Sequence, residues 1–370
     1  MSEHGDSTRV VRAGLPKVRQ GEPFLPGPVF AAPFHFSGEP EDSAFVYGRY
    51  GNPTWEHYEH ALGSLERAEA VLFPSGMAAV AALLLTELRP GSVLAVDSSC
   101  YLNVRRFAAA YLEDNEVEVR LAPASELAGS LDGATMLWLE SPSNPKLEVY
   151  DIAALAEAAQ RQGALTVVDN TTAGPLLQRP LDLGAGAVMT SATKQITGHA
   201  DLVLGYVTTR DPERAQRLRD WRRNSGSIPG PFEAWLAHRS LPTLSLRVKR
   251  GCANAQAVAA LIAGRDDVAA VHYPGLASDP GHEVARRQMH GYGMVVSFDL
   301  GSRERAKRFL AAAELIADAT SFGGVHSTAE RRARWRGDDV SEGFVRLSAG
   351  IEDTADLVAD VARALDACSS

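Results

Sequence analysis

The sequence predicts an α/β fold, with a large unit built on a mostly parallel sheet and a smaller α+β unit towards the C-terminus. From Glu69 onward, short apolar strands alternate with helical stretches, and this is the pattern of a parallel sheet covered by helices. The 370 residues are enough for about two domains, each with a substantial core. We expect an N-terminal arm over residues 1–42, a large domain over 43–240 and a C-terminal domain over 241–370.

The individual elements follow from local signals. The arm is expected to be extended and to pack on a partner, because it has little hydrophobic periodicity and is interrupted by Pro16, Pro23, Pro26, Pro28 and Pro33. Asn52 and Pro53 are a good N-cap and first-turn pair for a helix. The large unit then has expected strands at 71–73, 93–96, 136–139, 165–168 and 188–190, and helices at 77–88 and 152–161. The C-terminal unit has expected helices at 253–263 and 355–367, and strands at 268–271, 294–298 and 344–347.

Lys194 closes the run Ser191-Ala192-Thr193-Lys194, downstream of Asp169 at the end of an apolar strand. A lysine that can form a Schiff base, hydroxyls for a phosphate and a buried carboxylate for a pyridine nitrogen are what pyridoxal 5'-phosphate (PLP) requires. The carboxyl end of a buried strand is where open α/β sheets bind ligands. Taken singly, Asp169 is as well explained by a turn cap, and Lys194 by a solvated side chain. Their occurrence together with other motifs favours the cofactor.

Two further segments can bind an anion. A short strand runs into Ser75 and Gly76 before a helix, and the free N–H groups of such a helix start attract a phosphate that Gly76 lets approach closely. Tyr47 and Arg49 lie in the loop before Asn52, where a phenol and a guanidinium can grip a phosphate together. Alone, the first segment reads as an ordinary N-cap and the second as a surface arginine beside a packing tyrosine.

Six motifs occur in order along the chain: Tyr-x-Arg-x-x-Asn-Pro-Thr from Tyr47, Ser-Gly-Met-Ala-Ala from Ser75, Glu-Ser-Pro-Ser-Asn-Pro from Glu140, Val-Asp-Asn-Thr from Val168, Ser-Ala-Thr-Lys from Ser191, and Arg-Leu-Ser-Ala-Gly-Ile-Glu-Asp from Arg346. Together they resemble the Cys/Met-metabolism family of PLP enzymes, which includes cystathionine γ-synthases, cystathionine γ- and β-lyases and methionine γ-lyases. The resemblance implies PLP fold type I, like that of aspartate aminotransferase. It also implies a homotetramer of two dimers with shared active sites.

The resemblance implies catalytic roles for three residues. Lys194 matches the Schiff-base lysine, which later shuttles protons, and Asp169 matches the partner of the pyridine nitrogen. Tyr101 matches the aromatic residue that stacks on the cofactor ring. Assisting proton transfer or stabilising the departing group is a second role open to its phenol.

Binding roles are implied in the same way. The phosphate is matched to Ser191, Thr193, Gly76 and Met77, with Tyr47 and Arg49 reaching it from the neighbouring subunit. Asn144 is placed near the cofactor's phenolic oxygen and the substrate carboxylate. Arg346, helped by Ser321, is implied to pair bidentately with the α-carboxylate of an amino-acid substrate, a task that suits its planar fork.

Three positions depart from the family pattern. Leu102-Asn103-Val104 follows Tyr101 where relatives usually have Gly-Gly-Thr, or Gly-Cys-Thr in many methionine γ-lyases. His326 stands where cystathionine-handling relatives commonly carry a glutamate. Because an imidazole does not attract a distal ammonium as a carboxylate does, we expect His326 to bear on substrate identity. A hydrogen-bonded structural histidine is the alternative. The start, Arg12-Ala13-Gly14, replaces a common His-x-Gly.

The activity implied is that of a PLP-dependent carbon–sulfur lyase. By γ-elimination it converts cystathionine or methionine to 2-oxobutanoate, ammonia and a thiol. The alternatives are a cystathionine γ-synthase, which replaces the γ-substituent of an O-acylhomoserine by cysteine, and a catalytically silent PLP-binding relative. Elimination and replacement share their early steps, so the sequence leaves that choice open.

Composition limits the kinds of binding partner and the cell compartment that the sequence predicts. A net charge of −9 argues against general nucleic-acid binding, and we read the basic run 330–336 as a solvated loop or an anion-attracting entrance. Three scattered cysteines indicate neither a disulfide framework nor a metal site. The polar start and the shortness of the longest apolar run, 77–85, predict no membrane segment and a cytoplasmic enzyme.

Overall fold

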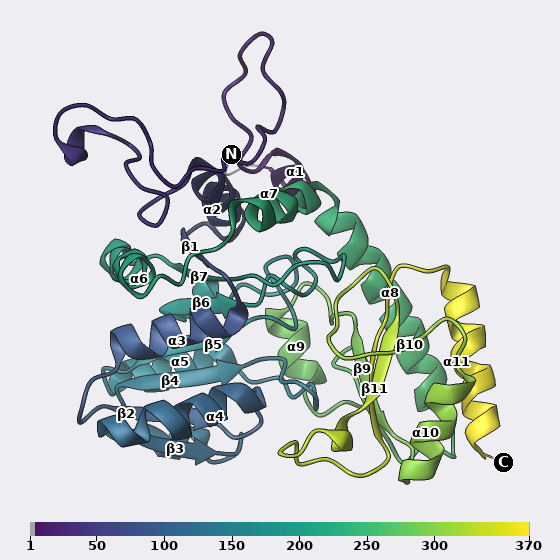
Figure 1. Cartoon of the computed structure of the whole chain (residues 1–370). Coiled ribbons are helices and arrows are strands. Elements are labelled where there is room, and N and C mark those ends of the chain that lie inside the picture. Colours follow the sequence, from purple (N-terminus) through teal and green to yellow (C-terminus); the bar gives the residue numbers. More distant parts are fainter. Residues whose placement is uncertain (1–3, 370) are drawn as a thin grey trace.

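A seven-stranded sheet forms the centre of the larger part of the molecule in the computed structural model, which describes residues 4–369 (Figure 1). Its strands lie in the order β1-β7-β6-β5-β4-β2-β3. Neighbours from β6 to β3 are parallel, whereas β7 runs antiparallel to both β6 and β1. The strands are β1 (Glu69–Phe73), β2 (Val93–Asp97), β3 (Glu118–Ala122), β4 (Met136–Glu140), β5 (Leu165–Asp169), β6 (Ala187–Thr190) and β7 (Gly205–Thr209). The predicted mostly parallel sheet is confirmed.

Helices cover both faces of this sheet. Successive side chains of a strand point to opposite sides, so each central strand contributes apolar side chains to both faces. Trp138 and Val167 pack with α3 (Gly76–Glu87), α4 (Leu102–Tyr111) and α6 (Pro212–Ser225) on one face. Leu139 and Val168 pack with α5 (Ile152–Arg161) on the other face. Burial on both faces explains why the central strands read as continuous apolar runs.

The helix predicted after Asn52 is α2 (Pro53–Glu66). The Asn52 side chain accepts a hydrogen bond from the Thr54 N–H at 2.9 Å, so the predicted cap forms. Its apolar stripe is buried against α7 (Pro231–Ser240), as Tyr58 and Leu62 have no exposed surface. Gly14 packs on the same helix with φ +68°, and an added Cβ there would lie 2.6 Å from the His57 carbonyl oxygen. Glycine is therefore required at this position.

The C-terminal part has a second sheet, in the order β10-β11-β12-β9-β8. Its strands are β8 (Ala270–His272), β9 (Val295–Asp299), β10 (Ala317–Asp318), β11 (Thr328–Arg331) and β12 (Phe344–Ser348), and the β10–β11 pair is parallel while the other neighbours are antiparallel. The helices of this part are α8 (Leu244–Ala263), α9 (His282–Gln288), α10 (Arg303–Ala312) and α11 (Thr354–Ser369). The core joins α8, α10 and α11 to β9 and β12, and this arrangement is the expected smaller α+β unit.

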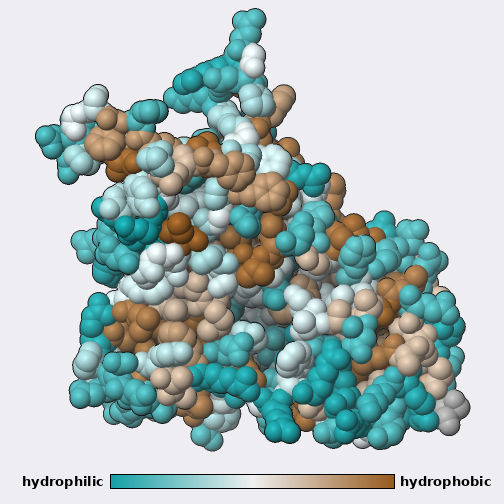
Figure 2. Space-filling view, viewed as in Figure 1, coloured by the Kyte–Doolittle hydropathy of each residue, from teal (hydrophilic) through white to brown (hydrophobic). Residues whose placement is uncertain are grey.

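The N-terminal segment differs from its prediction in one respect. Residues Asp6–Arg12 form helix α1, whose Val10 is buried in the core with α2 and α7. The rest of the segment runs as two loops that project from the body, seen in purple at the top of Figure 1 and again in Figure 2. Phe24 and Phe30 are 84% and 71% exposed there. Residues 1–3 of the predicted arm lie outside the described part, and the predicted domain boundaries at 43 and 241 stay predictions.

Within residues 4–369, no helix is both long enough and apolar enough to cross a lipid bilayer.

Candidate active site

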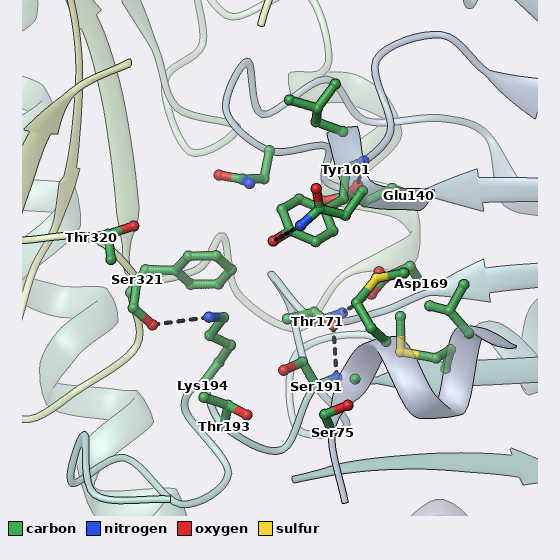
Figure 3. Close-up of a pocket in the computed structure, with 18 of the residues that line it drawn as sticks. Ser75, Tyr101, Glu140, Asp169, Thr171, Ser191, Thr193, Lys194, Thr320 and Ser321 are labelled. Carbon is green, nitrogen blue, oxygen red and sulfur yellow. Dashed lines mark hydrogen bonds between the residues drawn. The ribbon is translucent and has the colours of Figure 1, made fainter. Parts of the chain in front are cut away.

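A hollow of about 440 Å³ lies at the carboxyl ends of β4, β5 and β6, where the C-terminal part faces the larger sheet (Figure 3). Its wall takes residues from both parts of the chain. The predicted site residues that line it are Gly76, Met77, Tyr101, Asn144, Asp169, Ser191, Thr193, Lys194, Ser321 and Arg346. Residues from five of the six motifs, together with Tyr101 and Ser321, thus meet in one cavity.

Lys194 lies on the turn after β6 and points into this cavity (Figure 3). Its ammonium nitrogen donates a hydrogen bond to Ser321 Oγ at 2.9 Å and lies 5.1 Å from the centre of the Phe322 ring. Burial, reinforced by the Arg346 guanidinium and opposed by Asp169, lowers the pKa of Lys194 to about 8. At pH 7, roughly a tenth of the molecules therefore carry Lys194 as a neutral, nucleophilic amine, far more than for an ordinary lysine.

Asp169 ends β5 and is 4% exposed. Its Oδ1 accepts a hydrogen bond from the Thr171 N–H at 2.9 Å, which orients the carboxyl group. Burial raises its pKa, although the Thr171 hydrogen bonds and Lys194 oppose the shift. Burial thus destabilises the ionised form of this carboxyl group, and a cationic partner would stabilise it.

Glu140 ends β4 directly beside Asp169 in the parallel ladder, and it also lines the cavity. It accepts a hydrogen bond from the Tyr101 backbone N–H, at the start of α4. Burial and the neighbouring Asp169 charge raise its pKa. We did not predict Glu140 as a site residue, although it opens one of the motifs. An acidic residue at the end of a neighbouring parallel strand was the available signal.

The corner between α3 and the 191–194 turn is suited to a phosphate. Ser75 caps α3 by accepting from the Ala78 N–H at 3.0 Å, and the first N–H groups of a helix have no intrahelical acceptor. A Cβ added at Gly76 would lie 3.0 Å from the Ser191 Cβ, so a glycine keeps the gap open. The Ser191 hydroxyl faces the same corner in Figure 3. With the amine of Lys194 and the carboxyl of Asp169, this donor set fits PLP.

Arg346, on β12, is 3% exposed and enters the cavity from the opposite side. One terminal nitrogen donates to Asn144 Oδ1 at 2.6 Å, and the other donates to the Ser321 carbonyl oxygen at 2.8 Å. Burial lowers its pKa to about 10, so the guanidinium remains charged near neutral pH. Ser321 has φ +78°, an uncommon conformation for a residue with a side chain, and it places both of its oxygens towards cations of the site.

Three predicted site residues are not brought into this cavity by the single chain. Tyr47 is 42% exposed, and Arg49 donates to the Arg223 carbonyl oxygen at 2.8 Å. His326 is exposed on the turn before β11 and does not line the cavity. The predicted roles of these residues stay predictions.

For the basic run 330–336 the sequence predicts a solvated loop or an anion-attracting entrance, and the structure contradicts the first alternative for part of the run. Glu330 and Arg332 are buried, because Arg332 pairs with both Glu330 and Asp338. Arg332 and Trp335 line the cavity. These charges are therefore neutralised by acidic side chains nearby and not by water. The solvated-loop interpretation is therefore wrong for Glu330, Arg331 and Arg332.

The pKa of Lys194 predicts how the cofactor-free protein takes up PLP. We expect the capture rate to rise with pH and to level off above about 8, because only the neutral amine attacks the aldehyde. An ordinary lysine, with a pKa of about 10.4, would give a rate that keeps rising to about pH 10. The measurement is the rate of absorbance change after mixing with PLP across this range. A rate still rising above pH 9 would contradict the expectation.

Comparisons with known proteins give one consistent picture. Residues 7–366 match the family described as "Cys/Met metabolism PLP-dependent enzyme". A Streptomyces coelicolor protein named "Putative cystathionine gamma-lyase" is 53% identical, over 99% of this chain and 94% of its own length. A Mycobacterium tuberculosis cystathionine gamma-synthase is 41% identical over 87% of this chain and 86% of its own. The structure of CalE6, a methionine gamma lyase from Micromonospora echinospora, is 38% identical with a TM-score of 0.91, covering 99% of this chain and 100% of that one.

Proposed function

This chain belongs to the Cys/Met metabolism family of PLP-dependent enzymes, and from that premise we propose that it is a carbon–sulfur lyase acting by γ-elimination on sulfur amino acids. Its substrate is cystathionine or methionine, and its products are 2-oxobutanoate, ammonia and a thiol. The observation that carries the proposal is the meeting of Lys194, Asp169 and Arg346 around one cavity. The 53% identity to the Streptomyces coelicolor protein favours the lyase over the alternatives.

In this proposal each residue has a separate task. PLP, when bound, supplies an electron sink for a carbon that loses its proton. Asp169 keeps a positive charge at the pyridine nitrogen, while the neutral Lys194 amine takes the α-proton and returns it to another carbon. Ser321 Oγ, 2.9 Å from Lys194, orients that amine. Arg346 binds the α-carboxylate, with Asn144 fixing the guanidinium.

Tyr101 is placed to help a γ-substituent leave. It is the N-cap residue of α4, held there by its backbone hydrogen bond to Glu140. Its phenolic oxygen accepts a hydrogen bond from Asn103 Nδ2 at 2.9 Å. This hydrogen bond orients the phenol, whose own proton can then pass to a departing thiolate. Stacking on the cofactor ring is compatible with the same position.

A substrate panel tests the proposal. The purified protein is incubated separately with L-cystathionine, L-methionine, L-cysteine, and an O-acylhomoserine with cysteine, and the products are identified. We expect 2-oxobutanoate and ammonia from cystathionine or methionine. Formation of cystathionine as the main product from the last mixture would instead identify a γ-synthase, the activity named for the Mycobacterium tuberculosis relative. No turnover of any mixture would identify a silent relative.

We further propose that the active enzyme is a homotetramer with shared sites, located in the cytoplasm and binding no nucleic acid. Tyr47 and Arg49 lie on an exposed loop, outside the cavity of their own chain. Phe24 and Phe30 are exposed on the projecting N-terminal segment, and a partner subunit would remove this apolar surface from water. In this assembly the loop with Tyr47 and Arg49 reaches the phosphate corner of the neighbour, and His326 lies near the distal end of the substrate.

Mixing two inactive variants tests the shared site. Lys194→Ala removes the amine, and Arg49→Ala removes a proposed phosphate contact from the other subunit. In a mixed dimer, one of the two sites has both wild-type contributions, so about a quarter to half of the wild-type activity is expected to return. The measurement is turnover after joint refolding, with each variant alone as a control. Verified mixed dimers that stay inactive would show that each chain completes its own site.

A further inference from the structure

Glu330 gathers cavity-lining side chains around one buried carboxylate. It lies on β11 and has no exposed surface. Its Oε1 accepts hydrogen bonds from Arg346 and from Arg332, the latter at 2.6 Å. Its Oε2 accepts from the Trp335 indole N–H at 2.7 Å. Four of its donors belong to the cavity wall, whereas Glu330 itself does not line the cavity: Arg346, Arg332, Trp335 and Thr320, whose hydroxyl donates to Oε1 at 3.4 Å.

The position of Glu330 is set by strand pairing. Glu330 on β11 is directly opposite Arg346 on β12 in the antiparallel ladder, so the two side chains leave the sheet on the same face. The carboxylate, the Ser321 carbonyl and Asn144 together accept from three of the five N–H donors of Arg346 within the described chain. The Nε–H and one Nη1–H of the guanidinium have no acceptor within the described chain. Rotation of the guanidinium would break all three bonds.

The charges around Arg346 are balanced. Glu330 and Asp338 face Arg332 and Arg346, and these four groups carry no net charge. A third arginine, Arg334, also pairs with Glu330, and it is itself paired with Asp318. Burial by itself would raise the pKa of Glu330, but Arg346, Trp335 and Arg332 outweigh it and lower the pKa below its ordinary value. Glu330 therefore stays ionised when Arg346 binds an anion.

We propose that Glu330 is a positioning residue for substrate recognition: it holds the Arg346 guanidinium in the orientation that binds the substrate α-carboxylate, and it fixes Arg332 and Trp335 beside that site. The inference deepens the proposed function and rests on the role assigned there to Arg346. Because it acts through Arg346, Glu330 affects how well the amino acid is bound more than how fast bound substrate reacts.

The chain contains a matched control. Glu59 is also a buried carboxylate paired with a buried arginine, Arg222, and it also accepts a backbone N–H, from Leu72 at 2.7 Å. It lies on α2, its partner Arg222 lies on α6, and Glu59 does not line the candidate active site. Glu59→Gln thus removes a comparable buried charge without touching Arg346.

The experiment compares Glu330→Gln with Glu59→Gln as PLP-loaded enzymes. Two quantities are measured: KM and kcat for the productive substrate, and the Kd of glycine, from titration of the cofactor absorbance. Glycine has an α-carboxylate but no γ-substituent, so its Kd reports carboxylate recognition together with amine exchange at the cofactor, without any elimination step. In Glu330→Gln we expect KM and the glycine Kd to rise about 10-fold, with kcat within about 3-fold, as for loss of one charge-assisted hydrogen bond. Glu59→Gln is expected to leave both quantities unchanged.

The outcomes separate this inference from the proposed function. A wild-type glycine Kd in Glu330→Gln overturns the inference, and so does an equal rise in Glu59→Gln. Arg346→Lys tests the underlying assignment. If its glycine Kd is also that of the wild type, the proposed role of Arg346 fails, whatever Glu330 does. If Arg346→Lys weakens glycine binding and Glu330→Gln does not, only the inference fails.

Should Glu330→Gln not fold, Glu330→Asp replaces it. That variant keeps the charge but withdraws the carboxylate from Arg346 by one methylene. A raised glycine Kd with kcat near the wild-type value supports the positioning role. A wild-type Kd overturns it.

Discussion

Replacing Lys194 by alanine is expected to abolish turnover, with a loss of at least about 10⁴-fold, since proton transfer alone contributes about 10² to 10⁴. The amine is lost both as the nucleophile that holds PLP and as the carrier of the α-proton. The variant should bind PLP reversibly, without a covalent link. Borohydride reduction of the wild-type protein, followed by peptide mapping, should find the cofactor on the peptide that contains Lys194.

Lys307→Ala is the control for this experiment. Lys307 is exposed on α10, away from the cavity, and its loss should change neither activity nor cofactor retention. A reduced adduct on any lysine other than Lys194 would refute the assignment. So would substantial turnover by Lys194→Ala.

Asp169→Asn is expected to lower turnover by about 100-fold or more, because a neutral amide does not hold a positive charge at the pyridine nitrogen. The fold should tolerate the change, since an asparagine Oδ1 can still accept from the Thr171 N–H. Cofactor binding should weaken as well. Measurements of kcat and of PLP affinity test both points. Turnover within a few-fold of the wild type would contradict the role given to Asp169.

The same variant should have the opposite effect on the stability of the cofactor-free protein. Burial raises the pKa of the Asp169 carboxyl above its unfolded value, so the folded state holds this proton to a higher pH than the unfolded state does. Folding therefore loses stability as pH rises from about 4 through the raised pKa, and the full penalty applies above it. Asp169→Asn removes that penalty. We expect its unfolding temperature to exceed that of the wild type at about pH 8 and not at about pH 4.

An exposed aspartate provides the control of opposite sign. Asp211 caps α6 by accepting from Glu213 and Arg214 N–H groups, and these hydrogen bonds lower its pKa. Asp211→Asn should therefore give no gain in stability at about pH 8. An equal gain in both variants would indicate a general charge effect instead of burial at Asp169.

The parts of the fold that were predictable are those whose pattern is local. The runs 136–139 and 165–168 are apolar throughout because β4 and β5 are covered on both faces, and the α5 boundaries were predicted as the structure has them. Edge strand β3 was not predicted, because Glu118 and Arg120 break its apolar run where it faces water. Helix α1 was hidden by the prolines that follow it. This helix is stabilised by a tertiary contact, the burial of Val10 in the core.

The residues of the candidate site also differ in how far they could be predicted from the sequence. Lys194 and Asp169 could be predicted because cofactor chemistry demands those residue types, and the resulting family assignment is confirmed. Glu330 and Arg332 could not, because their burial depends on the pairing of β11 with β12. The seven residues 330–336 include four arginines and one glutamate, which is the composition of a solvated loop. Only the neighbouring strand shows that these charges neutralise one another away from water.

The place of β7 in the sheet has a consequence for the order of events during synthesis. Within the part of the chain that the structure describes, β1 pairs only with β7, so residues 69–73 gain this partner only after residues 205–209 have left the ribosome. The turn at Ser75 and Gly76 follows β1 directly, and Gly205 packs so closely on it that an added Cβ would lie 2.4 Å from the Ser75 carbonyl oxygen. Contacts this distant in the chain form slowly. We therefore expect the phosphate corner to be completed late, after the parallel strands from β2 to β6 have already emerged.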